Sequence, residues 1–533
     1  MPLVGEEIWS GINLLRGLPF FLRHPISKDQ AQIILRRRLE ERPARLINLI
    51  RRVATSPSWN PYSRILGWAG FELGDIEKLV SQEGVEAALR ILYRNGVYVT
   101  AEEFKGRRPI LRGSLRLVAE PRHFQMNPRS SSLFMQTSGS RGSGTPVPIN
   151  LDYLRSRAID SYLNLKACGG VHWAHGIWAV PGSSALAYLL ELAGFGARPV
   201  RWFSQVDLSS PNFHSRYRRS AQAIRWTSRM AGSSLPEPVY ASVDNPEPVL
   251  GWMKQALEFG QIPHLFTYTS SGLRLSEAAQ RDGANLTGAR ITVTGEPVTE
   301  LRLTNIRRCG ATVATRYGAA ESGTIGYGCL EPENPDEVHL LSDRLALIQK
   351  EEEGEKEGLP RGAFFVTTLE SSSPFFLLNL SLGDRGVVAD RNCGCPLNKL
   401  GWKTSLHSIV SFEKITSEGM TFLKADATRI IDEVLPALFG GSPTHYQLLE
   451  GDDERGRPYL KLLVHPDVGP VDDQALAGTF LDAMGRGRGV EKIMSRVWNE
   501  AKLLRVERRP PLLTASGKMQ PVYSQSQSLG VNR

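Results

Sequence analysis

The chain has 533 residues, 41% of them hydrophobic and 22% charged, and a formal net charge of +9. This length exceeds what one hydrophobic core usually organises and the composition is that of a globular protein, so we expect at least two domains and exclude a disordered or fibrous chain. No run of about eighteen uncharged apolar residues occurs, so we expect no transmembrane segment, and five cysteines in so long a chain favour a cytoplasmic protein over a disulfide framework.

The positive charge is compatible with three kinds of partner: nucleic acid, an acidic membrane surface and anionic small molecules. The arginines are spread over small clusters, and no known nucleic-acid-binding module accompanies them. We therefore expect anionic small molecules as ligands and no nucleic-acid partner.

Residues 1–130 are predicted to be helical and to belong to a large domain. The apolar stretch 8–22 is interrupted by two glycines and a proline, and we interpret it as a cap on that domain rather than as a membrane-surface segment. Residues 27–55 have apolar residues at helical spacing and a basic outer face, with Ser27 as N-cap and Gln30 three residues later. We interpret the basic face as solvated, with lipid or carrier-protein docking as the alternative.

Residues 131–411 are predicted to form the core of the large domain. Apolar strands alternate there with helices, a pattern typical of parallel sheets covered by helices on both faces. The strands predicted in this pattern are 177–181, 200–203, 264–268, 289–294 and 311–315. From about 338 to 400 strands follow one another without helices, which predicts a small, mainly antiparallel β subdomain.

Residues 412–533 are predicted to form a small, mobile α+β domain. A helix is expected to begin at Asp426 as N-cap and to end before Pro436. The remaining predicted elements are a hairpin of 446–450 with 459–464, a helix over 472–484 and a strand over 501–506. The fold class is therefore α/β: a large N-terminal domain of parallel sheets flanked by helices, a small β subdomain and a small C-terminal α+β domain.

Residues 137–146 contain five hydroxyl side chains, three glycines and one arginine. Glycines let main-chain N–H groups approach an anion closely, and hydroxyl and guanidinium groups add further donors. We interpret the stretch as a phosphate-binding loop, with a flexible linker as the alternative. The residues assigned to nucleotide binding here are Thr137, Ser138, Gly139, Ser140, Arg141 and Gly142.

Two further motifs can hold a nucleotide at the carboxyl ends of strands, where open α/β sheets bind ligands, and a third motif ends in an aspartate. They are Gly295-Glu296-Pro297, Tyr317-Gly318-Ala319-Ala320-Glu321 and Leu382-Gly383-Asp384. Tyr317 offers a flat face to a base, Glu321 an oxygen ligand to Mg²⁺, and Asp384 two hydrogen-bond acceptors. The alternatives are a core tyrosine, a solvated acid at a helix start and a turn aspartate.

With Thr514-Ala515-Ser516-Gly517-Lys518, these motifs resemble in order and separation those of the adenylate-forming superfamily of acyl-CoA synthetases, adenylation domains and luciferases. The phenylacetate-CoA ligase branch is the most similar, and the likeness covers about residues 130–520. It implies an acid-thiol ligase that uses ATP and Mg²⁺ to convert a carboxylic acid to its acyl-adenylate. The acyl group would pass to the thiol of CoA, with a carrier-protein thiol or an amine as alternatives, and a homodimer is one alternative for the oligomeric state.

The resemblance also implies a role for several residues. Tyr317 would stack on adenine, Glu321 would hold magnesium, and Asp384 would bind the ribose. Lys518 would be the catalytic lysine that neutralises charge as the carboxylate attacks the α-phosphate. Without the resemblance, we would interpret Lys518 as a solvated lysine in a mobile tail.

One departure from the family concerns the segment before the expected hinge, for which Glu413 and Lys414 are the candidates. The family usually carries an arginine shortly before the hinge, and that place falls near Val410. Lys403 and His407 are candidate substitutes, as is Lys414. Because of this departure, an alternative is that the chain binds nucleotide or acid without turnover. The presence of Glu321, Asp384 and Lys518 argues against this alternative.

A metal site is a further hypothesis. Cys329, His339, Cys393 and Cys395 would complete a tetrahedral structural zinc site, and some relatives in the phenylacetate branch look similar here. Reduced cysteines packed in the β subdomain are the alternative. His172 and His175 either line the acyl pocket or cap the strand that follows, and we favour the second interpretation.

Overall fold

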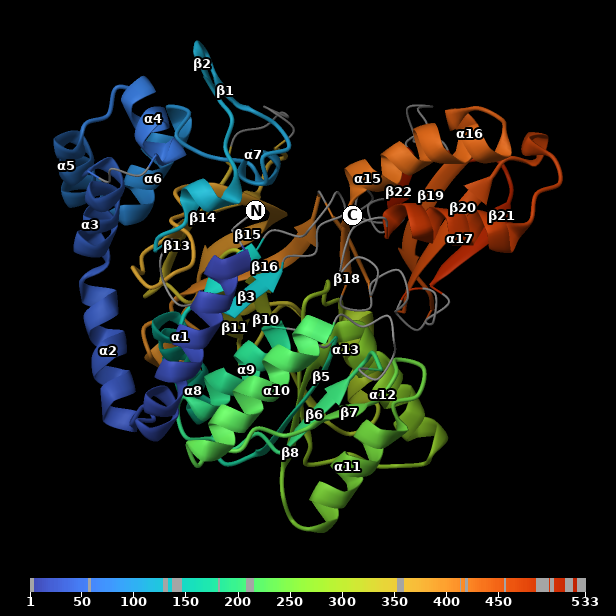
Figure 1. The fold of residues 1–533 in the computed structure, drawn as a ribbon, viewed down its shortest axis with the longest axis horizontal. Coiled ribbons are helices and arrows are strands. Elements are labelled where there is room, and N and C mark those ends of the chain that lie inside the picture. Colours follow the sequence, from blue (N-terminus) through green and yellow to red (C-terminus); the bar gives the residue numbers. More distant parts are fainter. Residues whose placement is uncertain are drawn as a thin grey trace.

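The computed structural model of the chain has a large sheet flanked by helices and, beside it, a smaller lobe with a sheet of its own (Figure 1). It describes residues 4–55, 59–127, 133–136, 146–180, 183–207, 215–351, 359–412, 414–417, 420–454, 457–485, 498, 503–512 and 521–524. In these ranges, none of the helices combines the length and the hydropathy needed to cross a bilayer. The predicted α/β fold class is confirmed.

The central sheet has 12 strands, and one half of it is parallel. Its parallel strands are β5 (Ala174–Ala179), β6 (Arg201–Ser204), β7 (Pro238–Tyr240), β8 (Pro263–Tyr268), β9 (Arg290–Thr294) and β10 (Thr312–Ala319). Helix α8 (Leu151–Ala167) precedes them, and the helices between them are α9 (Ser183–Ala193), α10 (Ser215–Met230), α11 (Glu247–Glu258), α12 (Thr269–Arg281) and α13 (Glu300–Arg307). The strands pair in the order β10-β9-β8-β5-β6-β7, as expected for alternating strands and helices.

The other half of the sheet is antiparallel. Its strands are β11 (Gly323–Gly328), β12 (Val338–Leu340), β13 (Leu345–Gln349), β14 (Ala363–Thr368), β15 (Leu380–Asp390) and β16 (Thr404–Ser411), with the short helix α14 (Pro396–Lys399) after β15. They continue the parallel half without a break, because β11 pairs with β10 on one side and with β12 on the other. The strands expected between about 338 and 400 are thus present and antiparallel, and they extend the main sheet.

The N-terminal region is mostly helical. Its helices are α1 (Val4–Arg23), α2 (Lys28–Glu40), α3 (Arg42–Thr55), α4 (Pro61–Trp68), α5 (Leu73–Glu83), α6 (Val85–Arg94) and α7 (Ala101–Phe104). Two of them, α6 and α7, contact the antiparallel half of this sheet at β13 and β15. Two short hairpins follow, β1 (Ile110–Arg112) with β2 (Leu115–Leu117) and β3 (Leu133–Gln136) with β4 (Pro146–Ile149). Ser27 caps α2 in a capping box with Gln30, as predicted. α1 packs against α8 and α10, as expected of a cap on the large domain.

A buried ionic network joins α2 to α8 and the sheet. Arg38 donates to Asp160 Oδ1 at 3.3 Å, and Arg344 donates to Asp160 Oδ2 at 2.5 Å and to Glu370 Oε2 at 2.6 Å. The prediction that the basic residues of α2 face solvent is therefore wrong for Arg38, which is buried. Buried charges are tolerated only when paired, so this network fixes where α2 lies on the domain.

The smaller lobe contains the four-stranded sheet β21-β20-β19-β22. Its elements are β17 (Lys414–Ser417), β18 (Met420–Leu423), α15 (Lys424–Arg429), a π-helical turn (Ile430–Val434), α16 (Leu435–Phe439), β19 (Tyr446–Asp452), β20 (Pro458–Val464), α17 (Asp473–Met484), β21 (Leu504–Arg508) and β22 (Val522–Ser524). The predicted hairpin and the helix after Asp472 are confirmed.

The predicted start and end of the first helix in this lobe are wrong. Asp426 lies inside α15 rather than at its N-cap, and Pro436 lies inside the helical segment rather than beyond it. Proline removes one N–H and crowds the carbonyl four residues earlier. The π-helical turn directly before α16 widens the backbone there, and Pro436 occupies the first turn of α16, where its missing N–H costs least.

Candidate active site

The motif residues gather at the carboxyl ends of the parallel strands. Gly295 follows β9 with φ +78°, and a Cβ there would lie 3.1 Å from the ring of Tyr268, so the tight turn requires glycine. Glu296 accepts hydrogen bonds from Ser270 N (2.7 Å) and Ser270 Oγ (2.8 Å) at the start of α12. Pro297 O accepts a hydrogen bond from Arg302 Nη1 at 2.8 Å. The predicted nucleotide-binding stretch 295–297 is thus a rigid turn whose carboxylate is used to hold α12.

Two of the motif residues, Tyr317 and Asp384, contact each other directly. Tyr317 Oη donates a hydrogen bond to Asp384 Oδ2 at 2.8 Å, from β10 and β15 respectively. Burial of the hydroxyl and the nearby charge of Asp384 raise the pKa of Tyr317 well above its ordinary value, so the phenol stays a neutral donor. Both side chains remain partly exposed.

Position 318, next to Tyr317, also requires glycine, because two strands approach each other closely there. A Cβ at Gly318 would lie 2.7 Å from Gly323 O, where β10 and β11 approach each other at a register shift between Tyr317 and Gly318. The close approach turns the chain through Ala319 and brings Glu321 to the same end of the sheet.

Glu321 forms a buried ion pair that the sequence did not reveal. Its Oε1 lies 3.7 Å from Lys105 Nζ, and the two side chains are 8% and 6% exposed. Lys105 directly follows α7, which packs against β15, the strand that carries Asp384. A lone lysine so distant in sequence from its partner gives no local signal, and only the packing of α7 brings the two together.

The glycine-rich loop, with Thr137, Ser138, Gly139, Ser140, Arg141 and Gly142, lies outside the described residues, as do Glu413 and Lys518; of Lys414 only the main chain, in β17, is described. The two ends of the loop are described, because Gln136 of β3 and Pro146 of β4 are paired in register. After β4 the chain enters α8, where Tyr153 Oη donates to Ser322 O at 3.0 Å. The hairpin that carries the loop is thereby tied to the turn that carries Glu321.

The smaller lobe contacts the large one near the same end of the sheet. Arg457 Nε in the β19–β20 hairpin donates to Glu277 Oε1 of α12 at 2.6 Å. The apolar cluster of the lobe also includes Val180 and Val206, which directly follow β5 and β6. The lobe is therefore placed at the carboxyl ends of the strands.

No family model matches the chain, and no curated protein matches it in sequence. Among solved structures, it is similar to 2-hydroxyisobutyryl-CoA ligase in complex with 2-HIB-AMP and CoA in the thioesterification state, with 16% identity over 95% of this chain and 94% of that chain and a TM-score of 0.56. The chain has the fold of the adenylate-forming ligases. Weaker likenesses include o-succinylbenzoate CoA synthetase from Bacillus subtilis (15% identity, 73% and 68% covered, TM-score 0.40) and an amide bond synthetase from Marinactinospora thermotolerans (13%, 88% and 83%, 0.39).

At the place where an adenylate-forming ligase usually carries an arginine, Val410 pairs in register with Arg385 of β15. Side chains directly opposite each other in an antiparallel pair point to the same face. Arg385 also follows Asp384 directly. Arg385 and Val410 therefore share one face of the sheet, whereas Asp384, the preceding residue of the strand, points to the other face.

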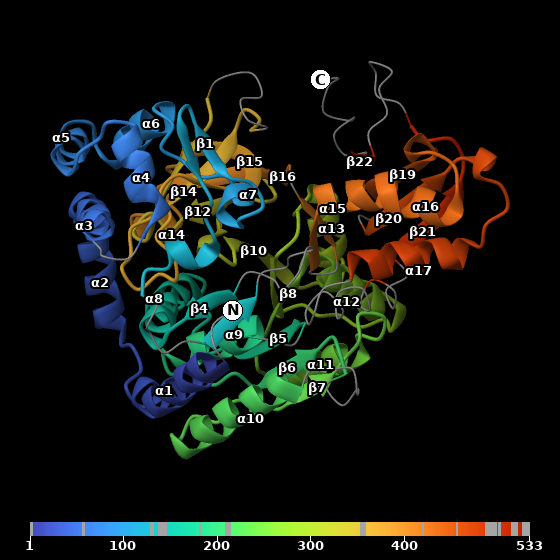
Figure 2. The same cartoon turned by 45° about the horizontal axis from the view of Figure 1, so that its top comes forward.

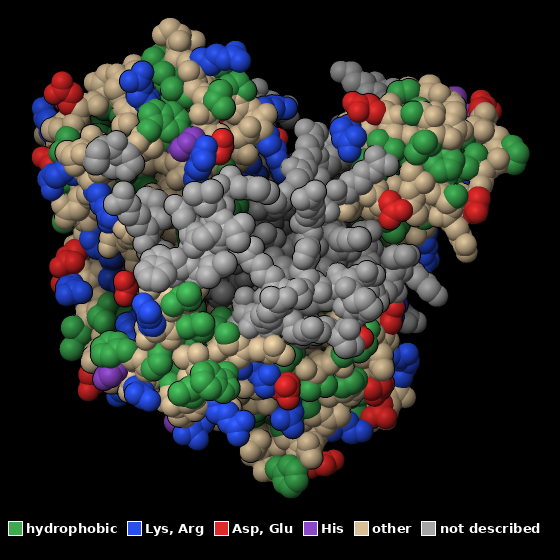
Figure 3. All heavy atoms as spheres, viewed as in Figure 1, with side chains coloured by type: hydrophobic (Ala, Val, Ile, Leu, Met, Phe, Trp, Pro, Cys, Tyr) green, Lys and Arg blue, Asp and Glu red, His purple; other side chains and the backbone are tan. Residues whose placement is uncertain are grey.

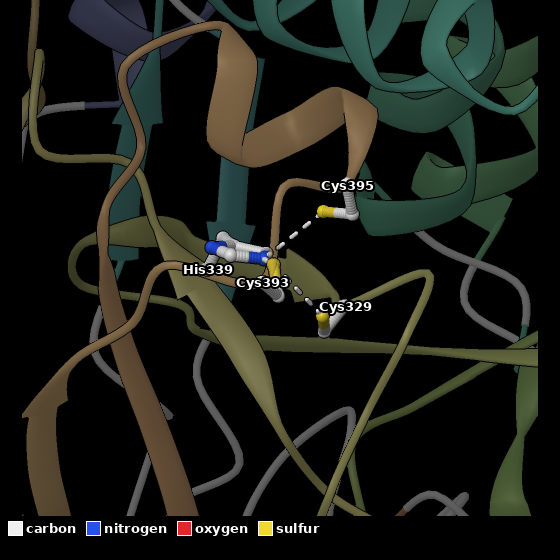
Figure 4. A group of neighbouring side chains, drawn as sticks. All are labelled: Cys329, His339, Cys393 and Cys395. Atoms are coloured by element: carbon white, nitrogen blue, oxygen red, sulfur yellow. Dashed lines mark hydrogen bonds between the residues drawn. The ribbon is translucent and has the colours of Figure 1, made fainter.

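The predicted metal ligands of this ligase fold converge on one point (Figure 4). Cys395 Sγ and Cys393 Sγ lie 3.3 and 3.5 Å from His339 Nε2, and Cys329 Sγ lies 3.7 Å from Cys393 Sγ. Tetrahedral zinc with ligands at about 2.3 Å (sulfur) and about 2.0 Å (nitrogen) requires separations of roughly 3.8 and 3.5 Å. His339 Nδ1 lies 2.7 Å from Trp402 O, which fixes Nε2 as the free acceptor. Donor chemistry and spacing therefore fit zinc.

The two histidines that were candidates for the acyl pocket lie elsewhere. His172 is exposed, whereas His175 lies near the amino end of β5, buried beside His264 of β8 with their Nδ1 atoms 2.8 Å apart. His264 Nε2 lies 2.8 Å from Thr292 Oγ1. The pair is thus far along the strands from the carboxyl ends and forms part of the packing of the sheet.

The histidine pair predicts a loss of stability in acid. Burial lowers the pKa of His175 to about 4 and that of His264 well below its ordinary value. Since unfolded histidine titrates near pH 6.5, the pair's contribution is complete above that pH and is lost as the pH falls toward 4. For His175 alone we expect a decrease on the order of 2–3 kcal/mol in the free energy of unfolding between pH 7 and pH 4.5.

Urea denaturation of the wild type and of His175→Asn at both pH values measures this contribution. The variant should lose less stability on acidification than the wild type. Thr267→Val is the control, because its buried hydroxyl donates to Trp178 O at 2.7 Å rather than contacting a titrating group, and it should lower stability about equally at both pH values. Equal pH dependence in the wild type and His175→Asn would contradict the assignment.

Proposed function

We propose that this chain is an AMP-forming ligase that activates a carboxylic acid with ATP and Mg²⁺ and then transfers the acyl group to the thiol of CoA. The observation that carries the proposal is the hydrogen bond between Tyr317 and Asp384, made at the carboxyl ends of the sheet and next to the turn of Glu321. Two motifs from distant parts of the sequence, 317–321 and 382–384, thus meet at one place on a ligase fold.

The proposed nucleotide site uses each group for what its chemistry allows. The partly exposed ring of Tyr317 stacks on adenine, and Asp384 accepts hydrogen bonds from the ribose hydroxyls with its second oxygen. Backbone and hydroxyl donors of residues 137–142 bind the phosphates. The turn 295–297, together with Gly318 and Ala319, lines the nucleotide site.

Glu321 is the proposed magnesium ligand, and bound Mg²⁺ would neutralise phosphate charge. Displacement of pyrophosphate by a carboxylate then needs positioning and electrostatic stabilisation rather than a protein nucleophile. We assign the electrostatic role to Lys518. We place the domain boundary near residue 412, with Glu413 and Lys414 as the hinge about which the small domain turns between the two half-reactions.

Acid-dependent exchange of labelled pyrophosphate into ATP tests the proposal. We expect exchange with at least one member of a panel of aryl and aliphatic carboxylic acids, and thioester formation when CoA is then added. Hydroxamate or amide formation without any thioester would reassign the acceptor to an amine. No exchange with the whole panel would support the alternative of ligand binding without turnover.

Lys105 is a proposed positioning residue for this site. Because its ammonium group lies within ion-pair distance of Glu321 in a buried place, it competes with Mg²⁺ for the same carboxylate. Lys105→Met should therefore lower the Mg²⁺ concentration that gives half-maximal exchange by about threefold or more. Lys105→Arg keeps the charge and serves as the control, with a requirement close to that of the wild type. An unchanged Mg²⁺ requirement in the methionine variant would restrict Lys105 to a packing role.

We further propose that Cys329, His339, Cys393 and Cys395 hold a structural zinc ion. All four ligand positions are supplied by the chain, so the ion would have no open position for a substrate. Its role would be to fasten β12 to the segment between β15 and α14.

A further inference from the structure

Two helices that lie side by side, α1 and α10, form a surface with an unusual composition (Figure 2). Arg23 Nη2 donates to Met230 O at 3.4 Å and joins their ends. Three large apolar side chains on this surface extend into solvent, with exposed fractions of 68% for Phe20, 66% for Trp226 and 62% for Met230. Apolar side chains of this size are rarely grouped on a surface that contacts only water.

Arginines are interleaved with these side chains along both helices. The exposed positions include Ile12, Arg16 and Phe20 on α1, spaced by four residues, and Trp226 and Arg229 on α10. Residues at this spacing share one face of a helix. The sequence of α10 contains no acidic residue, and the two acidic residues of α1 stand in its first turn. Figure 3 shows hydrophobic and basic side chains gathered over these helices.

An open groove of about 580 Å³ adjoins Trp226 and is lined in part by Arg225, Arg229 and Leu235. Arg225 is paired there with Glu237 at 3.1 Å. The groove therefore has apolar side chains, Trp226 and Leu235, on its wall. Arg229 adds a positive charge besides that of Arg225, which is paired with Glu237.

We propose that the surface formed by α1 and α10 binds the headgroup region of an anionic lipid bilayer. A protein–protein interface concentrates apolar side chains at its centre and charges at its rim. Here arginines and apolar side chains alternate along two neighbouring helices, the arrangement found in helices that lie in the plane of a membrane interface. A second copy of the chain would bring arginines against arginines, whereas an anionic surface complements them, as it does the net charge of +9.

Co-sedimentation of the full-length protein with vesicles tests the proposal. We expect binding to phosphatidylcholine vesicles that contain about one-third phosphatidylglycerol, weak binding to phosphatidylcholine alone, and weakening as salt is raised. The double variant Phe20→Ser/Trp226→Ser should lower the vesicle partition coefficient by at least about tenfold. Arg16→Glu/Arg229→Glu should lower it similarly at low salt.

The matched control is Phe259→Ser. Phe259 is 74% exposed and follows α11, whose buried residues belong to a different apolar cluster from those of α1 and α10, so its replacement should leave vesicle binding unchanged. Circular dichroism and the thermal midpoint verify that each variant is folded. Absence of binding to the anionic vesicles, or binding that the surface variants do not weaken, would overturn the proposal. A dimer in light scattering that the same variants dissociate would instead assign the surface to a second copy.

Discussion

Cys395→Ser is expected to abolish zinc binding and to destabilise the protein more than substitution of His175 or of any surface residue. A serine hydroxyl stays protonated at neutral pH and cannot replace a thiolate ligand. Because the binding free energy of a structural zinc ion contributes to folding, removal of one buried ligand should lower the free energy of unfolding by several kcal/mol, roughly 3–5. The loss should appear in urea denaturation of the purified protein.

The position of the cluster explains the size of the effect. Cys329 follows β11, His339 lies in β12, and Cys393 and Cys395 lie between β15 and α14. The strand between these segments, β16, is paired with both β12 and β15. An ion bound by all four side chains thus joins the segments on both sides of β16, including the end of β15, which carries Asp384. Loss of zinc should for this reason weaken nucleotide binding as well as stability.

Elemental analysis of protein purified without added metal is the direct measurement. The wild type should contain about one zinc ion per chain, and Cys395→Ser only a trace. Cys309→Ser is the matched control, since Cys309 is equally buried but donates to Ile306 O far from the cluster. It should retain zinc. A trace of zinc in the wild type, together with three cluster thiols that react with Ellman's reagent on mild unfolding, would show that these are reduced packing cysteines.

The sequence predicted those parts of the fold that depend on local patterns. Alternating strands and helices indicated the parallel half, and strands without helices between them indicated the antiparallel half. Tyr317 was expected at the nucleotide site because it follows a predicted apolar strand, and Asp384 because of the resemblance to the ligase family. Their hydrogen bond was not predicted, because it depends on the order in which β10 to β16 pair across the sheet.

The features that the sequence did not reveal depend on contacts between distant segments. Arg38 has the helical spacing of a surface residue, and only the buried carboxylates of α8 and of the segment after β14 explain why it turns inward. Lys105 reaches Glu321 through the packing of α7 against β15. His175 lies next to a predicted strand, but its partner His264 is in another one. Each of these pairings is long-range, and no local pattern encodes it.

Lys518→Ala is expected to lower acid-dependent pyrophosphate exchange by about 100-fold or more, because one charge-stabilising group at the transition state typically contributes this much. The described ends of its loop support the assignment. Leu512 N donates to Gln447 Oε1 at 2.6 Å, and Leu448 N donates to Pro521 O at 2.8 Å. The segment that carries Lys518 therefore begins and ends at two adjacent residues of β19, in the lobe that contacts α12.

The two half-reactions separate a catalytic role from a structural one. If Lys518 acts only in adenylate formation, the alanine variant should still transfer the acyl group from a synthetic acyl-adenylate to CoA at a rate within a few-fold of the wild type. Lys461→Ala is the matched control in the same lobe, where Lys461 pairs with Glu507 at 3.0 Å on the surface, and it should change neither rate by more than about twofold. Equal loss of both half-reactions would indicate a damaged lobe, and unchanged exchange would remove Lys518 from the mechanism. Loss of exchange alone would mean that the loop anchored on β19 delivers its ammonium group to the phosphates bound at the carboxyl ends of the sheet.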